Sequence, residues 1–245
     1  MSNRQQAFWT PKRSEEPEQM DQPGLEPELV REAHQVLRTV NRQFFGAGWV
    51  LRRELRSWTK EEKLPQALTL LDLGAGSGDL MLEANQMLKK LGHSPHALAV
   101  DRDPIPLAMA RQDRLFALQA DALQLPLPDR CCDLVCAIKF AHHFSGPALV
   151  KLLAEMGRVS RSRVLVLDIK RDWLAYAGFV AWSRVFTRNP LVRFDGPLSV
   201  RRGFLPKELL EAARHVEEFE WSVRRYAGFQ LALVGRRQTQ REQNR

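Results

Sequence analysis

Long hydrophobic runs are missing from this sequence. No apolar stretch approaches the roughly 18–20 residues that a membrane-spanning helix needs. The segment Met1–Asp21 is polar and lacks the apolar centre of a secretory signal. We therefore expect a cytoplasmic protein.

Cysteine is also scarce, and no cluster of metal ligands is evident. Cys131, Cys132 and Cys136 share one apolar segment and have no partners at the spacing of a zinc site, so we expect reduced, buried thiols. No group of acidic residues indicates a divalent metal, although Asp168 could contribute to one. We therefore predict no metal site. Internal repeats are absent as well.

A dense basic block is the third feature that the chain lacks. The net charge of +8 is spread over 156–171, 184–202 and 224–245. A scattered positive surface is often only a solvated one, which argues against a nucleic-acid partner. The 245 residues are enough for one large α/β domain with appendages.

What the chain does have is a glycine-rich stretch after an apolar run. The run 68–73 predicts a buried strand, and glycines follow at positions 74, 76 and 78 before a helical pattern begins at Asp79. Glycine lets the backbone adopt positive φ and lets a ligand approach closely, and the N–H groups of the following helix face that ligand. Strand, turn and helix N-terminus together predict a binding site.

The spacing of this stretch narrows the ligand. Dinucleotide folds use G-x-G-x-x-G to hold a pyrophosphate, whereas this chain has G-x-G-x-G between Asp72 and Asp79. Two carboxylates disfavour a pyrophosphate and suit a ligand with an ammonium group and a positive sulfur. From Asp72 to Gly78 the chain resembles the first motif of the class I S-adenosylmethionine-dependent methyltransferases. An NAD oxidoreductase is the competitor that the spacing disfavours.

The rest of the chain alternates strands and helices, which predicts a parallel sheet. The resemblance implies an α/β, Rossmann-like sheet of seven strands, mostly parallel with an antiparallel last strand and helices on both faces. We expect a disordered tail over 1–24, a helical cap over 25–63, the methyltransferase domain over 64–236 and a basic tail over 237–245. The cap could cover the active site or only pack on the sheet. Strands are predicted at 68–73, 96–100, 115–119, 133–138, 163–167, 217–226 and 229–235.

Polar residues just after the strands are candidate cofactor ligands, because ligands bind at the carboxyl ends of such strands. By resemblance, Asp101 would accept hydrogen bonds from the ribose, Arg102 would flank the adenosine, and Asp121 with Ala122 would contact the adenine. Asp101 could instead cap a surface helix, and Asp121 could form an Asx turn. The full set predicted to bind S-adenosylmethionine is Asp72, Gly74, Ala75, Gly76, Gly78, Asp79, Asp101, Arg102, Asp121, Ala122 and Lys139.

After the fourth predicted strand come His142 and His143, where methyl donor and acceptor should meet. The Asn/Asp-Pro-Pro-Tyr/Phe sequence typical of nucleobase and amide methylases is missing there. The His-His-Phe sequence is similar instead to relatives of the ubiquinone and menaquinone methyltransferases. Either imidazole could remove a phenolic proton, or could only pack or cap a helix. Positioning and desolvation could also supply the rate without a base.

An insertion at about 170–205 follows the fifth predicted strand. The segment 173–182 is apolar nearly all round, so it is buried, lines a substrate pocket or touches a membrane surface. We interpret 193–204, rich in Arg, Gly and Pro, as a substrate-side loop. Arg201 or Arg202 could pair with an acceptor oxygen there, or form salt bridges with Glu208 or Glu211. The predicted substrate residues are Arg201, Arg202, Trp173 and Tyr176.

The resulting hypothesis is methyl transfer from S-adenosylmethionine to an oxygen or carbon of a small aromatic acceptor, such as a lipophilic phenol or quinol. The alternatives are an RNA or protein methyltransferase and a non-catalytic cofactor-binding partner protein. We expect a monomer or homodimer, with peripheral membrane contact among the readings left open.

Overall fold

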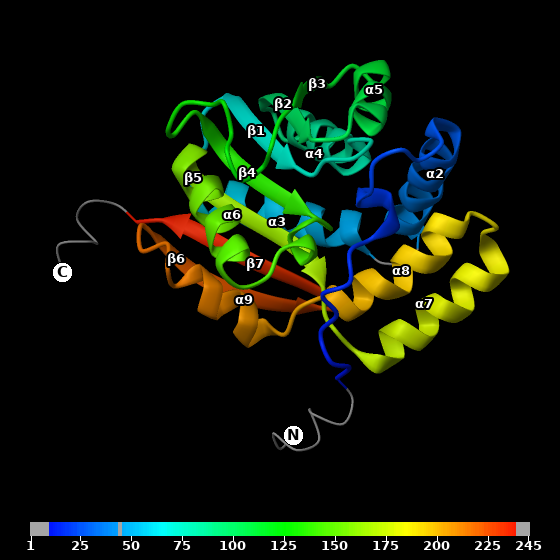
Figure 1. Cartoon of the computed structure of the whole chain (residues 1–245). Coiled ribbons are helices and arrows are strands. Elements are labelled where there is room, and N and C mark those ends of the chain that lie inside the picture. Colours follow the sequence, from blue (N-terminus) through cyan, green and yellow to red (C-terminus); the bar gives the residue numbers. More distant parts are fainter. Residues whose placement is uncertain (1–9, 44–45, 239–245) are drawn as a thin grey trace.

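The structure, a computed structural model, describes residues 10–43 and 46–238 (Figure 1). Its centre is one seven-stranded sheet of order β3-β2-β1-β4-β5-β7-β6. The first five strands are parallel, and β7 runs antiparallel to both of its neighbours, as predicted. The strands are β1 Ala67–Leu73, β2 Ser94–Asp101, β3 Phe116–Gln119, β4 Cys132–Ile138, β5 Ser160–Ile169, β6 Phe219–Tyr226 and β7 Gln230–Arg237.

Helices form three groups around this sheet. Two groups pack on opposite faces: α3, α4 and α5 on one, α6 and α9 on the other. The third group, α2, α7 and α8, has a hydrophobic cluster of its own. The helices are α2 Pro27–Gln43, α3 Ala47–Glu61, α4 Asp79–Lys90, α5 Pro104–Gln112, α6 Gly146–Val159, α7 Trp173–Phe186, α8 Pro190–Arg202 and α9 Pro206–Ala213, with short 3₁₀ turns η1 Gln19–Asp21 and η2 Ala141–His143.

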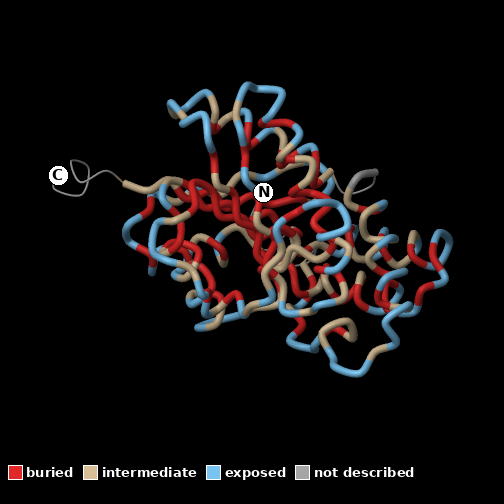
Figure 2. The backbone as a smooth tube through the Cα atoms, turned by 90° about the horizontal axis from the view of Figure 1, so that it is seen from above, coloured by how far each residue is buried: buried red, intermediate tan, exposed pale blue. Residues whose placement is uncertain are grey.

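The centre of the sheet is covered on both faces. Every residue of β4 is buried, which explains why that strand is a continuous apolar run rather than an alternating one. Figure 2 shows buried residues concentrated along the central strands and exposed ones around the rim. The strand order reverses between β1 and β4, and such a switch point is where open α/β sheets bind ligands.

The predicted glycine turn joins β1 to α4. Gly78 adopts a left-handed conformation (φ 72°) as the residue before α4. Gly74 also has positive φ (62°), and a Cβ there would lie 2.0 Å from the ring of Phe140. A side chain at either position would strain the backbone, and at Gly74 it would also collide with the loop after β4.

Two predictions about local structure are wrong. Residues 10–24 were expected to be disordered, yet this segment packs across the domain and buries Glu18 to 5% exposure. The predicted loop 193–204 is mostly the helix α8, which tolerates Pro190 because proline suits the first turn of a helix. The expected basic tail lies outside the described residues from position 239 onward, as do residues 1–9 of the predicted N-terminal tail.

Among the described residues, no helix is long and apolar enough to cross a membrane.

Candidate active site

The residues predicted to bind the cofactor lie along one edge of the sheet. Asp121, Asp101, the glycine turn and Lys139 follow β3, β2, β1 and β4, and these four strands are consecutive in the sheet. Because parallel strands end at the same edge, positions scattered over the sequence between 72 and 139 become neighbours.

Three carboxylates give this edge a negative charge. Asp72 is 2% exposed, and its Oδ1 has no hydrogen-bond partner among the described residues. Burial, together with the charges of Asp79 and Asp101, raises the pKa of Asp72 well above its usual range. The carboxylate of Asp72 accepts a backbone hydrogen bond from Ile138, but its Oδ1 has no partner in the described part of the chain. A buried carboxylate with an unpartnered oxygen, close to two other acids, suits a cationic ligand.

Asp101 already holds the turn. Its carboxylate accepts hydrogen bonds from the backbone N–H of Gly76 (2.9 Å) and of Asp103 (3.0 Å). Each carboxylate oxygen has a second lone pair, so Asp101 keeps the capacity to accept from ribose hydroxyls. Asp121 accepts from the N–H of Leu123 (2.8 Å), which is the Asx turn left open by the sequence, while Ala122 is buried.

Helix α2 lies directly over the glycine turn. The guanidinium of Arg38 donates to the hydroxyl and the carbonyl of Ser77, both at 2.8 Å. The imidazole of His34 lies beside Gly76, 3.2 Å from where a Cβ would be. Helix α3 instead packs on the sheet through residues such as Trp58. Of the two N-terminal helices, α2 therefore lies over the predicted cofactor turn, and α3 packs on the sheet.

Lys139 sits after β4 with a positive φ of 57°. Its ammonium donates to the side-chain oxygen of Gln230 on β7. Burial lowers the pKa of Lys139 to about 8, against the opposing charge of Asp168. The side chain is therefore tied to the opposite half of the sheet.

The N-terminal segment, residues 10–24, runs across the carboxyl edge of the sheet. Arg13 donates to the carbonyls of Arg202 (2.9 Å) and Phe144 (2.8 Å), which anchors the segment on the loop after β4 and on the end of α8. Further along, the backbone carbonyl of Asp21 accepts a hydrogen bond from Arg102 (3.1 Å), one of the residues predicted to bind the cofactor.

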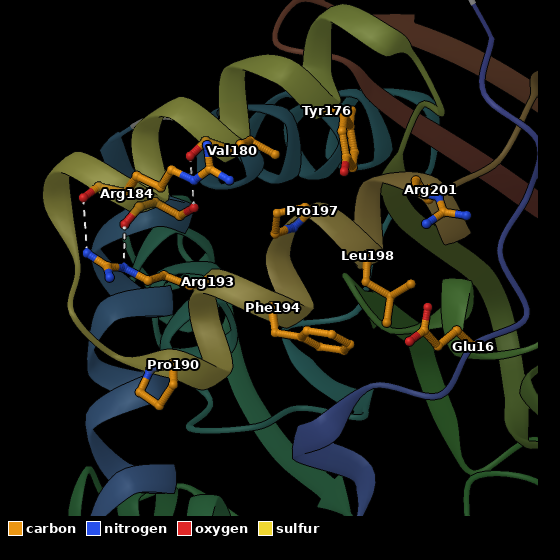
Figure 3. Close-up of a pocket in the computed structure, with 11 residues that line it drawn as sticks. Glu16, Tyr176, Val180, Arg184, Pro190, Arg193, Phe194, Pro197, Leu198 and Arg201 are labelled. Carbon is orange, nitrogen blue, oxygen red and sulfur yellow. Dashed lines mark hydrogen bonds between the residues drawn. The ribbon is translucent and has the colours of Figure 1, made fainter.

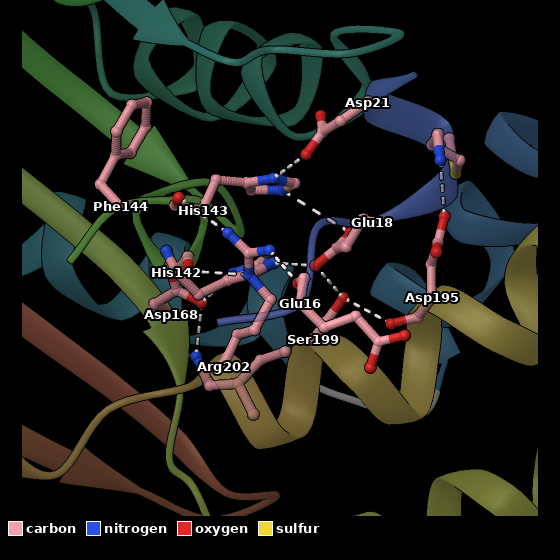
Figure 4. A network of polar contacts seen from close by, with 12 residues as sticks. Glu16, Glu18, Asp21, His142, His143, Phe144, Asp168, Asp195, Ser199 and Arg202 are labelled. Carbon is pink, nitrogen blue, oxygen red and sulfur yellow. Dashed lines mark hydrogen bonds and ion pairs between the residues drawn. The ribbon is translucent and has the colours of Figure 1, made fainter. Parts of the chain in front are cut away.

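His142 lies in the centre of the polar network shown in Figure 4. Its Nδ1 is 2.8 Å from Asp168 and its Nε2 is 3.3 Å from Glu18. Burial alone lowers the pKa of His142, but Asp168 and then Glu18 outweigh it and raise the pKa to about 9. In this arrangement the imidazole is protonated at neutral pH, which argues against the predicted role of His142 as a general base.

His143 lies next to it and is oriented in the same way. Its Nδ1 is 2.7 Å from Asp21 and its Nε2 is 3.7 Å from Glu18. The two imidazole rings have centroids 4.6 Å apart and are tilted by 30°. The role of His143 in catalysis stays a prediction.

The predicted substrate residues separate into two groups. Tyr176 and Arg201 line a cavity of about 500 Å³ between α7 and α8 (Figure 3). Arg202 is buried and donates to the backbone carbonyls of His142 (3.3 Å) and His143 (2.8 Å), so it supports the histidine loop. Trp173 is 43% exposed and contacts the ring of Tyr176 edge-on.

Neither of the two predicted alternative partners, Glu208 and Glu211, forms an ion pair with Arg201 or Arg202 among the described residues. Glu208 pairs with Arg171 (2.7 Å), not with Arg201 or Arg202. In the segment 173–182, Phe179 is buried, Tyr176 lines the cavity, and Trp173 and Leu174 are exposed. Substrate binding and membrane contact of this segment stay predictions.

Sequence reasoning missed Glu18, Asp21, Arg13 and Arg38 as site residues. The first three lie in a Gln-, Glu- and Pro-rich segment whose composition is typical of disorder, so no signal pointed to them. Asp168, in contrast, was detectable as an acidic residue at a strand end.

The fold, the glycine turn and the carboxylates at the carboxyl edge define a class I S-adenosylmethionine-dependent methyltransferase, and the chain belongs to this family. A family profile described as "Methyltransferase domain" matches residues 70–177. The chain is 32% identical over 160 residues to the demethylmenaquinone methyltransferase of Thermus thermophilus, a match that covers 60% of this chain and 68% of the relative.

Solved structures show the same fold. A SAM-dependent methyltransferase from Aquifex aeolicus has a TM-score of 0.57 and 16% identity, covering 86% of this chain and 98% of that one. The plantazolicin methyltransferase BpumL, in complex with SAH, has a TM-score of 0.63 and 10% identity, covering 86% of this chain and 95% of that one.

Proposed function

We propose that this enzyme methylates an oxygen or carbon of a lipophilic phenol or quinol. The observation that carries the proposal is the 32% identity to a demethylmenaquinone methyltransferase, a relative named for a quinone-type acceptor. The missing Asn/Asp-Pro-Pro-Tyr/Phe sequence after β4 supports an acceptor other than a nucleobase.

S-Adenosylmethionine supplies the electrophilic methyl group when bound. We propose that Asp72 and Asp79 balance its positive charges, that Asp101 accepts from the ribose, and that Asp121 and Ala122 contact the adenine. The orphaned Oδ1 of Asp72 supports this fit, because a cationic ligand would give it a partner. The glycine turn leaves room for close backbone approach.

The acceptor side is built from α7, α8 and the N-terminal segment. The cavity of about 500 Å³ combines Val180, Phe194 and Leu198 with the guanidinium of Arg201. Arg184, Arg193 and Glu16 also line this cavity. A lining of apolar side chains and cationic groups suits an aromatic ring that bears an anionic or polar oxygen. We propose that this cavity receives part of the acceptor and that Tyr176 contacts its ring.

The outer face of α7 supports contact with a membrane surface. Leu174, Val185 and Phe186 are 65%, 74% and 66% exposed. The helix has no acidic residue, and Arg184 and Arg188 lie exposed at its C-terminal end. Apolar side chains beside arginines fit an anionic bilayer, from which a lipophilic acceptor could be taken.

The test uses methyl-labelled S-adenosylmethionine. We would incubate the purified chain with demethylmenaquinol in detergent and, in parallel, with lipid, polar, RNA and protein fractions of a bacterial extract. We expect label in the quinol and in the lipid or phenolic fraction, and loss of that label in Asp101→Ala. Label in RNA or protein would contradict the proposal, and so would cofactor binding without label in any fraction.

A further inference from the structure

Two histidines next to one another in sequence each contact an aspartate through Nδ1 and share Glu18 through Nε2. Nδ1 of His142 contacts Asp168, and Nδ1 of His143 contacts Asp21. A carboxylate can only accept a hydrogen bond, so Nδ1 carries the hydrogen in both rings. In both rings the remaining nitrogen, Nε2, points toward Glu18.

This arrangement requires a positive charge between the groups. The Nε2 atoms lie 3.3 and 3.7 Å from the two oxygens of Glu18, and a lone pair facing a carboxylate is repulsive. A proton on Nε2 of His142 satisfies the contact with Glu18 for that ring alone, and protonating both rings would place two positive charges on rings only 4.6 Å apart. One divalent cation bound by all three groups satisfies both nitrogens and the carboxylate without that repulsion.

The spacing agrees with a metal centre. The ligand atoms of Glu18, His142 and His143 lie within 4.8 Å of one another. For tetrahedral zinc with bonds of about 2.0–2.1 Å, neighbouring ligand atoms are about 3.3 Å apart, so modest movement of the side chains would suffice. Metal-binding histidines almost always donate their other nitrogen to a carboxylate or carbonyl, and Asp168 and Asp21 are placed to accept here.

We propose that Nε2 of His142, Nε2 of His143 and the Glu18 carboxylate bind one divalent transition-metal ion, such as Zn²⁺. The mixed nitrogen and oxygen ligands suit such an ion better than Mg²⁺ or Ca²⁺. This replaces the sequence-based prediction that the chain has no metal site. The inference stands on contacts of these residues and does not depend on the identity of the methyl acceptor.

The ion would join two distant parts of the chain. Glu18 belongs to the N-terminal segment, and the histidines to η2 after β4 (Figure 4). Metal binding would therefore hold the segment closed over the acceptor side. Three protein ligands leave a fourth position free for water or an oxygen of a bound molecule.

The experiment measures binding of Zn²⁺ alone to the full chain, without a polyhistidine tag and after treatment with a chelator. We would titrate by calorimetry and count the retained ion by elemental analysis, with no cofactor or acceptor present. We expect one ion per chain. Glu18→Gln and His143→Gln should each weaken binding by more than about 100-fold, and Asp21→Asn by about 10- to 100-fold, the usual cost of losing an orienting partner.

Glu15→Gln is the matched control, since it removes the same charge from an exposed position of the same segment. It should bind Zn²⁺ like the unmodified chain. Circular dichroism would show that each variant is folded, and the visible spectrum with Co²⁺ would report the ligands independently. No stoichiometric ion in the unmodified chain would overturn the proposal, as would undiminished binding in folded Glu18→Gln and His143→Gln.

Discussion

Replacing Asp72 by Asn should stabilise the protein and weaken cofactor binding. Asp72 is 2% exposed and its Oδ1 has no partner in the part of the chain that the structure describes. Without a ligand, the folded state therefore keeps a buried carboxylate oxygen that has no hydrogen-bond partner. Asn has nearly the same shape and removes the charge that Asp79 and Asp101 repel.

The size of the stability effect follows from burial. Leaving a buried polar group unsatisfied costs about 1–3 kcal/mol, so the free energy of unfolding should rise by that amount. Burial and the neighbouring acids raise the pKa of Asp72 above its unfolded value of about 4. The folded state then binds the extra proton, so stability falls as pH rises from about 4 toward the raised pKa. The gain in the variant should accordingly be largest at neutral or higher pH and vanish near pH 4.

The binding effect has the opposite sign. A charge-assisted hydrogen bond contributes about 1.5–3 kcal/mol, so losing one should raise the Kd for S-adenosylmethionine about 10- to 150-fold. Denaturant unfolding at several pH values would measure stability, and calorimetry would measure the Kd.

Asp133→Asn is the matched control for this change. Asp133 is 5% exposed but accepts from the N–H of Thr69 (2.8 Å) and from Arg161 (2.6 Å). We expect that variant to lose about 1–3 kcal/mol of stability with an unchanged Kd. If Asp72→Asn were destabilising, the Oδ1 atom of Asp72 would have a partner in the folded state. If its Kd stayed unchanged, Asp72 would not balance the charge of the cofactor.

Three further predictions concern other parts of the site. Asp101→Ala should raise the Kd for S-adenosylmethionine at least about 10- to 150-fold in calorimetry, because a charge-assisted bond of about 1.5–3 kcal/mol to the ribose is lost. An unchanged Kd would leave Asp101 with only its contact to the turn. Arg38→Gln should remove the bonds to Ser77 and speed amide hydrogen exchange in the glycine turn about 10-fold; unchanged protection would show that α2 does not hold the turn. Phe186→Glu should weaken binding to anionic vesicles, measured by sedimentation, about 10- to 100-fold, which is the contribution of burying one aromatic side chain. Phe116→Glu, at an equally exposed position on β3, should leave vesicle binding unchanged. Equal effects of the two changes would argue against α7 as the membrane contact.

Much of the cofactor side was predictable. The strands from β1 to β5 begin and end within about three residues of their predicted bounds, because their apolar runs are bounded by turns and polar residues. The turn at Gly74–Gly78 was also predictable from local sequence, because its conformation depends on glycines a few positions apart.

The acceptor side was not predictable in the same way. Helix α8 was expected to be a loop, because Gly196 and Pro197 weaken any helical pattern. The structure keeps the helix because Asn189 caps its start and Leu191, Val192 and Leu198 bury their side chains. Tertiary packing here outweighs local propensity.

The sequence by itself determined the sheet, the glycine turn and the class of cofactor, since each depends on residues close together in the chain. Only the tertiary structure decided how the acceptor side is closed. Glu18 and His142 meet although 124 positions separate them (142 − 18), and Arg13 binds the carbonyl of Arg202 across 189 positions. A polar segment such as 10–24 has no hydrophobic pattern to mark its packing. Its place follows from hydrogen bonds to groups that distant elements present only once the domain has folded.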